Sequence, residues 1–128
     1  MAERRRGPTT APWAEKVGYS RAIRVGDTIY VSGTAPVGED GEIEAPGDLY
    51  GQSKRCLDMI VAALGEAGAR PEHVVRTRIY VRDASRWEEV GRAHAEVLGH
   101  AKPATTLVEV AGFVHADILV EIEAVAVV

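Results

Sequence analysis

Residues 117–128 read DILVEIEAVAVV, and this short stretch decides the class of fold. It is rich in valine and isoleucine, and its alternation is that of a β-strand with one face in a core. Two carboxylates, Glu121 and Glu123, lie two residues apart and therefore on the same face. A buried carboxylate must be ion-paired or have a functional role. This strand therefore predicts a sheet face that is neither an apolar core face nor a fully solvated surface.

Two earlier stretches also combine apolar and charged residues. KPATTLVEVAGF (residues 102–113) is a strand-like segment that carries Glu109. EHVVRTRIYVRD (residues 72–83) alternates strictly, which predicts that Val75 shares one face with Thr77, Ile79 and Val81. We expect the opposite, charged face of the sheet to hold Arg76, Arg78, Tyr80, Glu109, Glu121 and Glu123.

The N-terminal part predicts two more strands within YSRAIRVGDTIYVSGTAP (residues 19–36). The segment 25–28, VGDT, is typical of a tight hairpin turn between them, since glycine and aspartate tolerate positive φ. Residues 1–15 are either an extended arm or a short first strand. We interpret the basic run 4–6, RRR, as a solvated part of this arm, because three arginines are a weak indication of nucleic-acid binding.

Two helices are predicted from period-3.6 apolar patterns. The first begins after Asp48, a plausible N-cap, and stops at Gly68; its apolar face holds Cys56, Leu57, Ile60, Val61 and Leu64. The second begins at Ser85 as N-cap and ends at Gly99. Its apolar side is expected to hold Trp87, Val90, His94, Val97 and Leu98, with His94 as a packing residue.

The order of elements predicts one α+β domain over residues 1–128. Strand–helix–strand crossovers are right-handed, so both helices should cover the same face of a mixed β-sheet. The other, charged face is too mixed for a core and too apolar for a free surface. Such faces commonly form subunit interfaces, and we therefore expect an oligomer.

Composition narrows the class of protein. The chain has 128 residues, a net charge of −4 and one cysteine, Cys56, which fits a reducing, cytoplasmic setting without disulfides. The acidic balance argues against a general nucleic-acid partner. No apolar run is long enough for a membrane span, and the four histidines lack the spacing of metal ligands. We expect no metal site.

Four ordered blocks resemble the Rid family (reactive intermediate deaminase, also YjgF-type or L-PSP endoribonuclease-like). They are GYSRAIRVGDTIYVSGTAP, VVRTRIYVRD, PATTLVEV and VEIEAVAV. The resemblance implies a chorismate-mutase-like fold, a homotrimer with three clefts between subunits, and no metal or organic cofactor. It further implies hydrolysis of enamine and imine products of pyridoxal-phosphate enzymes to 2-oxo acids and ammonia.

The resemblance also implies site residues. Glu121 takes the place of a catalytic glutamate that positions and activates water. The substrate-binding positions are Tyr19, Ser32, Gly33, Thr105 and Leu107. At Thr105 the family has an arginine that grips the substrate carboxylate, and at Leu107 many members have a cysteine.

The missing arginine leaves three interpretations open. The substrate lacks a carboxylate, another cation such as Arg24 or Arg76 replaces the arginine, or the cleft only binds. We favour the first, because threonine supplies only neutral hydrogen bonds. The leading hypothesis is thus a Rid-type hydrolase or deaminase acting on an imine-like metabolite. The alternative is a non-catalytic trimeric small-molecule-binding protein, and an endoribonuclease ranks third.

Individual acids and histidines also have competing interpretations. Glu121 is either a general acid or base in a cleft, with a raised pKa, or a structural partner of Arg76 or Arg78. Glu109 and Glu123 are interpreted first as structural. His115, in the loop between the last two strands, is a weaker candidate for a pocket rim.

Overall fold

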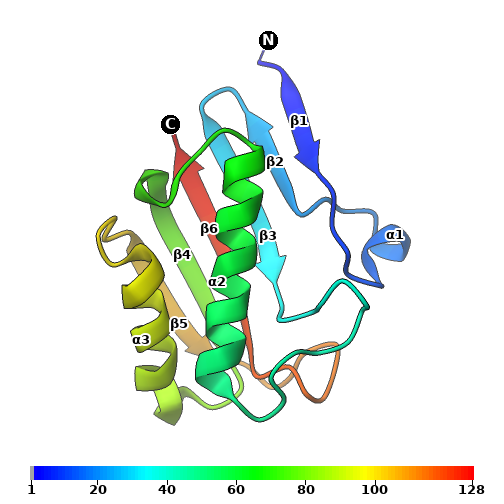
Figure 1. Ribbon diagram of the computed structural model, residues 1–128, viewed down its shortest axis with the longest axis vertical. Helices are drawn as coiled ribbons and strands as arrows, with labels where there is room; N and C mark the ends of the chain where they lie inside the picture. Colours follow the sequence, from blue (N-terminus) through cyan, green and yellow to red (C-terminus); the bar gives the residue numbers. More distant parts are fainter. Residues whose placement is uncertain (1) are drawn as a thin grey trace.

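The computed structural model describes residues 2–128 and shows a six-stranded mixed sheet with two long helices on one face (Figure 1). The elements, in chain order, are β1 (Arg4–Gly7), α1 (Ala14–Val17), β2 (Ala22–Val25), β3 (Thr28–Thr34), α2 (Leu49–Glu66), β4 (Val74–Val81), α3 (Trp87–Leu98), β5 (Ala104–Glu109) and β6 (Val120–Val127). Short 3₁₀ turns, Pro71–His73 and Ala84–Arg86, precede β4 and α3. The predicted α+β class, with both helices on one face, is confirmed.

The stretch that set the fold class, β6, lies inside the sheet. The strand order is β1-β2-β3-β6-β4-β5, and every neighbouring pair is antiparallel except β4 and β5. Thus β6 pairs with both β3 and β4 and joins the N-terminal hairpin to the C-terminal half. The N-terminal segment forms an edge strand, β1, rather than a free arm.

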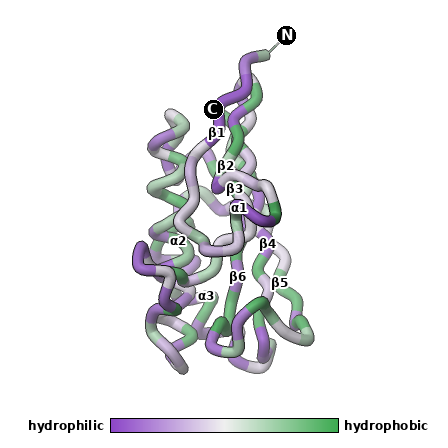
Figure 2. The backbone as a smooth tube through the Cα atoms, turned by 90° about the vertical axis from the view of Figure 1, so that its right-hand side faces the viewer, coloured by the Kyte–Doolittle hydropathy of each residue, from purple (hydrophilic) through white to green (hydrophobic). Residues whose placement is uncertain are grey.

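The two faces of the sheet have different chemistry. The helices α2 and α3 cover one face of the sheet, here called the helix face (Figures 1 and 2). This face packs aliphatic side chains against the helices. Its core includes Ile29, Val31, Ile79, Val81, Val120, Ile122 and Ala124. The opposite side, here called the open face, carries Tyr30, Arg76, Arg78, Tyr80, Glu121 and Glu123.

Two residues lie on the other face from the one predicted. A register shift between Val74 and Arg76 turns Val74 into the core and leaves Val75 46% exposed. Because side chains alternate with period two, one extra residue reverses the face of everything before it. Glu109 was expected on the open face, but it pairs with Val81 at the parallel β4–β5 contact and lies on the helix side. There its carboxylate accepts a hydrogen bond from the Ala84 N–H at 3.0 Å.

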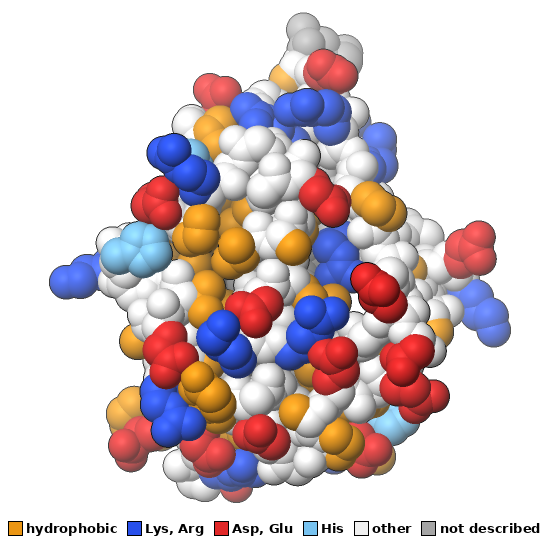
Figure 3. Space-filling model, viewed as in Figure 1, with side chains coloured by type: hydrophobic (Ala, Val, Ile, Leu, Met, Phe, Trp, Pro, Cys, Tyr) orange, Lys and Arg blue, Asp and Glu red, His pale blue; other side chains and the backbone are white. Residues whose placement is uncertain are grey.

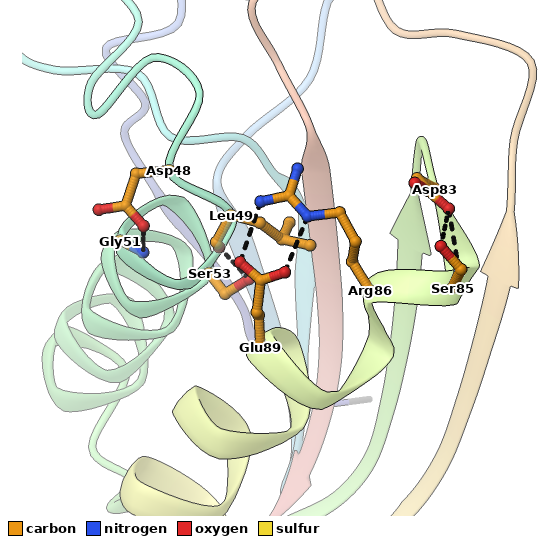
Figure 4. A network of polar contacts seen from close by, with 8 residues as sticks. All are labelled: Asp48, Leu49, Gly51, Ser53, Asp83, Ser85, Arg86 and Glu89. Carbon is orange, nitrogen blue, oxygen red and sulfur yellow. Dashed lines mark hydrogen bonds and ion pairs between the residues drawn. The ribbon is translucent and has the colours of Figure 1, made fainter.

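The N-cap predicted for α2 is confirmed, and the one predicted for α3 is not (Figure 4). Asp48 caps α2 by accepting from the Gly51 N–H at 2.9 Å, as expected. Ser85 was wrong as the N-cap of α3, because a 3₁₀ turn intervenes and Asp83 accepts from both the Ser85 N–H and its hydroxyl. This extra turn rotates Trp87 out of the apolar side and leaves it 57% exposed.

The loop before β6 is fastened to α2 by one buried side chain. The Gln52 amide nitrogen donates to the Asp117 carbonyl, and its oxygen accepts from the Leu119 N–H, both at 2.8 Å. Since a buried amide left unpaired is costly, these bonds specify where β6 begins. No described helix is long and apolar enough to cross a membrane.

Candidate functional site

Glu121 lies at the middle of the open face, on the best-anchored strand. It stands opposite Tyr80 of β4, and Gly33 of β3 approaches it from the other side. The β3–β6 register shifts between Val31 and Thr34, so Gly33 lies in an irregular part of the strand. A Cβ atom on Gly33 would come 3.1 Å from Glu121 Oε2, so glycine leaves the carboxylate its space.

The environment of Glu121 favours proton chemistry. Its side chain is half-buried, and among residues 2–128 it makes no hydrogen bond or ion pair. Burial, with a smaller contribution from Glu123, raises the pKa of the Glu121 carboxyl. A carboxyl that is partly desolvated and not committed to a structural partner has the properties of a general acid or base. The alternative of a structural ion pair with Arg76 or Arg78 does not match these contacts.

Glu123, two residues along, has the structural contacts that Glu121 lacks. It accepts a short hydrogen bond from the Tyr80 hydroxyl, and Arg78 Nη1 lies 3.8 Å from its Oε1. The hydrogen bond to Glu123 raises the pKa of the Tyr80 phenol, with burial adding to it. Glu123 is therefore engaged on its own sheet face, as expected.

Tyr19, Ser32 and Gly33 come together beside these acids. All three line a small cavity of about 20 Å³ between residues 9–13, the end of β3 and α2. That volume holds about one water molecule. Tyr19 and Ser32 also line a shallow groove of about 360 Å³ that reaches Tyr30 and Glu123 on the open face. The space for a substrate is therefore the groove rather than the enclosed cavity.

Hydrogen bonds determine what Ser32 can offer a ligand. Its hydroxyl donates to the Ser20 carbonyl at 2.6 Å, and its N–H donates to the Arg21 carbonyl at 2.8 Å. Ser32 is thus left with hydroxyl lone pairs as acceptors, and its N–H is used within the fold. The Ser32 N–H is therefore not available as a backbone donor to a developing oxyanion.

Arg21 is a residue of this region that the sequence analysis missed. It lines the same small cavity as Tyr19 and Ser32. Its guanidinium makes two long hydrogen bonds, to the Pro8 carbonyl and the Thr9 hydroxyl, both at 3.3 Å. Burial lowers its pKa, but an arginine stays charged at neutral pH. The available indication was its spacing, since Arg21 lies two residues after Tyr19 at the start of a strand.

Thr105 and Leu107 lie elsewhere in the chain. Both are on β5, the outermost strand, and their register partners are Thr77 and Ile79 on the helix side of β4. Glu121, in contrast, projects from the open face of β6. A single chain therefore places Tyr19, Ser32 and Gly33 around one cavity and Gly33 against Glu121, but leaves Thr105 and Leu107 apart from them.

Thr105 belongs to a neutral polar cluster, here called the threonine–histidine cluster: Thr77, His94 and Thr105. The two threonine hydroxyl oxygens are 2.8 Å apart, and His94 Nε2 lies 2.9 Å from the Thr77 oxygen and 3.5 Å from that of Thr105. Burial lowers the pKa of His94, which favours its neutral form. His94 thus packs against the sheet, as predicted, and in addition makes hydrogen bonds to it.

The other suggested cations do not adjoin Thr105. Arg24 donates to the Gly26 and Ala67 carbonyls at 2.9 and 2.7 Å, at the far side of the sheet from β5. Arg76 is next to Thr77 on β4 and therefore projects to the opposite face. His115 accepts from the Asp117 N–H through Nδ1 at 3.0 Å, which is a local loop contact. Within residues 2–128, no group of three or more His, Cys, Asp or Glu side chains is placed to hold a metal ion.

Comparison with known proteins agrees with this fold. Residues 9–128 match the family described as Endoribonuclease L-PSP. The chain is 40% identical to a RutC family protein of Pyrococcus abyssi over 84% of each chain. It is 32% identical to the 3-aminoacrylate deaminase RutC of Acinetobacter baylyi, over 84% of this chain and 85% of that one.

A solved structure extends the likeness to three dimensions. The crystal structure of Rv2704 from Mycobacterium tuberculosis, a member of the YjgF/YER057c/UK114 family, superposes with a TM-score of 0.88 at 43% identity, covering 98% of this chain and all of that one. The fold and the matched sequence together define an α+β protein of the YjgF type. The chain belongs to the L-PSP family, also called Rid or YjgF.

Proposed function

We propose that this protein is a Rid-type deaminase that hydrolyses an imine-like small metabolite, with Glu121 as its general acid and base. One observation carries the proposal: the half-buried Glu121 carboxylate has a raised pKa and no structural partner among the described residues, and Gly33 leaves space beside it. The activity named for the Acinetobacter relative, 3-aminoacrylate deamination, supports the reaction class. In this reaction water adds across C=N: its oxygen bonds to carbon, and Glu121 carries one of its protons to nitrogen. Glu121 then moves the hydroxyl proton of this carbinolamine to nitrogen, the C–N bond breaks, and ammonia leaves as C=O forms.

The proposed site is formed between subunits of a homotrimer. The open face holds charged side chains among apolar ones and has no covering element in the described part of the chain, which suits a subunit interface. Thr105 and Leu107 on the edge strand β5 then reach the groove beside Glu121 of a neighbouring subunit. The separation of the two groups within one chain is the reason for placing the cleft between chains.

We further propose that the substrate is not a standard 2-imino carboxylate. A hydrogen bond to a charged group contributes about 1.5–3 kcal/mol, against about 0.5–1.5 kcal/mol for a neutral one. Thr105, within a neutral cluster, belongs to the weaker class. Among residues 2–128, Arg21 is the only cation that lines the small cavity with Tyr19 and Ser32. Because Tyr19 and Ser32 also line the groove, Arg21 replaces Arg24 and Arg76 as the candidate for binding the end of an anionic substrate.

The test compares two imines made in situ. An amino-acid oxidase supplies a 2-imino acid, and an amine oxidase supplies an imine without a carboxylate. We expect the native protein to hydrolyse the second faster, and Thr105→Arg to gain about tenfold or more on the first. The matched control is Thr106→Arg, which adds the same charge on the next residue and the opposite face of β5.

Other outcomes separate the remaining hypotheses. Fast hydrolysis of the 2-imino acid by the native protein, lost in Arg21→Ala, would mean that Arg21 grips the carboxylate and that our substrate proposal is wrong. A native protein that hydrolyses neither imine, but is stabilised against heat by small metabolites, would be a trimeric binding protein. The threonine–histidine cluster supports this second function, because it offers a ligand neutral hydrogen bonds where the family has an arginine.

A further inference from the structure

A separate cavity of about 220 Å³ lies between β1, β2 and the C-terminal part of α2. None of the residues proposed for the deaminase site lines it. Basic side chains gather at the end of the molecule where β1 lies, on the side that the helices cover (Figure 3). This is where the run Arg4-Arg5-Arg6 is placed by the pairing of β1 with β2.

Two arginines lie side by side at this cavity. Arg5 is the register partner of Arg24, so both side chains project from the same face, and both line the cavity. Like charges directly opposite on neighbouring strands are destabilising unless something neutralises them. Within residues 2–128, neither guanidinium forms an ion pair with a carboxylate.

Arg24 is held in a fixed position for binding. Its Nε donates to the Gly26 carbonyl at 2.9 Å and its Nη1 to the Ala67 carbonyl at 2.7 Å. These bonds fix the plane of the guanidinium against the end of α2 and leave Nη2 for another partner. A fixed guanidinium loses little conformational freedom when an anion binds.

We propose that the pair Arg5 and Arg24 binds the phosphate group of a small phosphorylated metabolite. Paired guanidinium groups suit phosphate because their planar donors match its oxygens and their two charges match a dianion. Arg6, Pro8 and Glu66 also line the cavity. The remaining lining is small residues, Gly7, Ala22, Ala63 and Ala67, which leave room for a compact apolar part. The cavity is on the helix side of the sheet, so the subunit packing proposed for the open face leaves it accessible.

Glu66 should affect phosphate binding in the opposite direction from the two arginines. It also lines the cavity and places one negative charge near the two arginines. It lowers the affinity for a phosphate dianion, and it keeps weaker, singly charged anions from accumulating. Neutralising Glu66 should therefore tighten phosphate binding, whereas neutralising Arg5 should weaken it.

The probes are inorganic phosphate and glycerol 3-phosphate, titrated calorimetrically into the full chain at constant ionic strength set with chloride. We expect Arg5→Ala to weaken phosphate binding by about tenfold or more, and Glu66→Gln to tighten it severalfold. The matched control is Arg4→Ala, which removes the same charge from the opposite face of β1. It should change the affinity by less than about twofold. Circular dichroism checks that the variants keep the native fold.

Either of two results would overturn the proposal. No measurable phosphate binding by the native protein would remove the site. Equal weakening by Arg4→Ala and Arg5→Ala would mean a diffuse basic surface in place of a built pocket. Tighter binding of glycerol 3-phosphate than of phosphate supports a phosphorylated metabolite, and equal binding supports free phosphate as the natural ligand of the same arginine pair.

Discussion

The surroundings of Glu121 and of Thr105 differ in charge and in the number of strands that pair with the strand carrying each residue. Glu121 lies on β6, which is hydrogen-bonded on both sides, among Glu123, Arg78 and Tyr80. Thr105 lies on β5, which has one neighbour and mostly exposed side chains, within a cluster of two hydroxyls and a neutral imidazole.

This difference indicates which positions of the sheet tolerate amino-acid substitution. A half-buried acid on a central strand is held in place by the register of two neighbours, so only a residue of similar size and shape can replace it without displacing them. A side chain on an exposed edge strand can change from cationic to neutral at little cost to folding, because water solvates either kind. Reaction chemistry is therefore assigned to the centre of the sheet and substrate preference to its edge, and four substitutions test this division.

The largest effect is expected from Glu121→Gln. Removing a general acid or base lowers turnover about 10²- to 10⁴-fold, and the fold should persist because Glu121 has no structural partner among the described residues. Steady-state rates on the better imine measure it, beside Glu109→Gln, whose carboxylate is on the helix side. Because the pKa of Glu121 is raised, the native rate should fall on the acid side at a higher pH than the pKa of an ordinary glutamate would give. Full activity of Glu121→Gln would remove the assignment.

Gly33→Ala should reduce the rate next most. The added Cβ, 3.1 Å from Glu121 Oε2, displaces the carboxylate, and small misplacements of a catalytic group cost about tenfold or more. The control is Gly65→Ala in α2, where an added Cβ meets nothing within 4 Å. If both variants keep the native kcat, the close approach of Gly33 has no catalytic meaning.

His94→Leu should affect stability and not the chemical step. It deprives the buried Thr77 hydroxyl of one partner, while Thr105 remains, for a loss of about 1 kcal/mol in the free energy of unfolding. Denaturant titrations measure this loss, with His94→Gln as the variant that keeps a hydrogen-bonding group. A loss of kcat without a loss of stability would place His94 in the reaction instead.

The contribution of His94 to the free energy of unfolding should depend on pH in a defined direction. The folded-state pKa of His94 lies below its unfolded value, so the unfolded chain takes up the proton first as pH falls. Its contribution to stability is complete above the unfolded pKa and declines as pH falls from there through the folded pKa. His94→Leu should flatten this part of the stability profile.

The smallest effect is expected from Tyr80→Phe. It removes the hydrogen bond to Glu123 but leaves Arg78 nearby, so an isolated chain should lose only about 0.5 kcal/mol at this partly exposed position. Thermal denaturation at several protein concentrations measures it. A concentration-dependent loss supports the proposed packing of the open face in an oligomer, and a loss independent of concentration speaks against it.

The sequence by itself determined the kinds of elements and the presence of a charged sheet face. Periodicity predicted α2 and the β2–β3 hairpin, and the turn at Gly26 has the positive φ that its residue type favours. The family resemblance named Tyr19, Ser32, Gly33 and Glu121; the first three line one cavity, and Gly33 also lies against Glu121. Such features depend on local patterns of a few residues, which the order of amino acids contains directly.

Only the tertiary structure decided which side chains share a face and which meet. A one-residue register shift turned Val75 outward, and the parallel pairing of β5 placed Glu109 on the helix side. Arg21 adjoins the cavity and His94 meets Thr105 because separate elements are packed together. The physical reason is that strand pairing and helix packing depend on contacts between residues far apart in the chain, and a shift of one residue reverses a side chain without changing the local pattern.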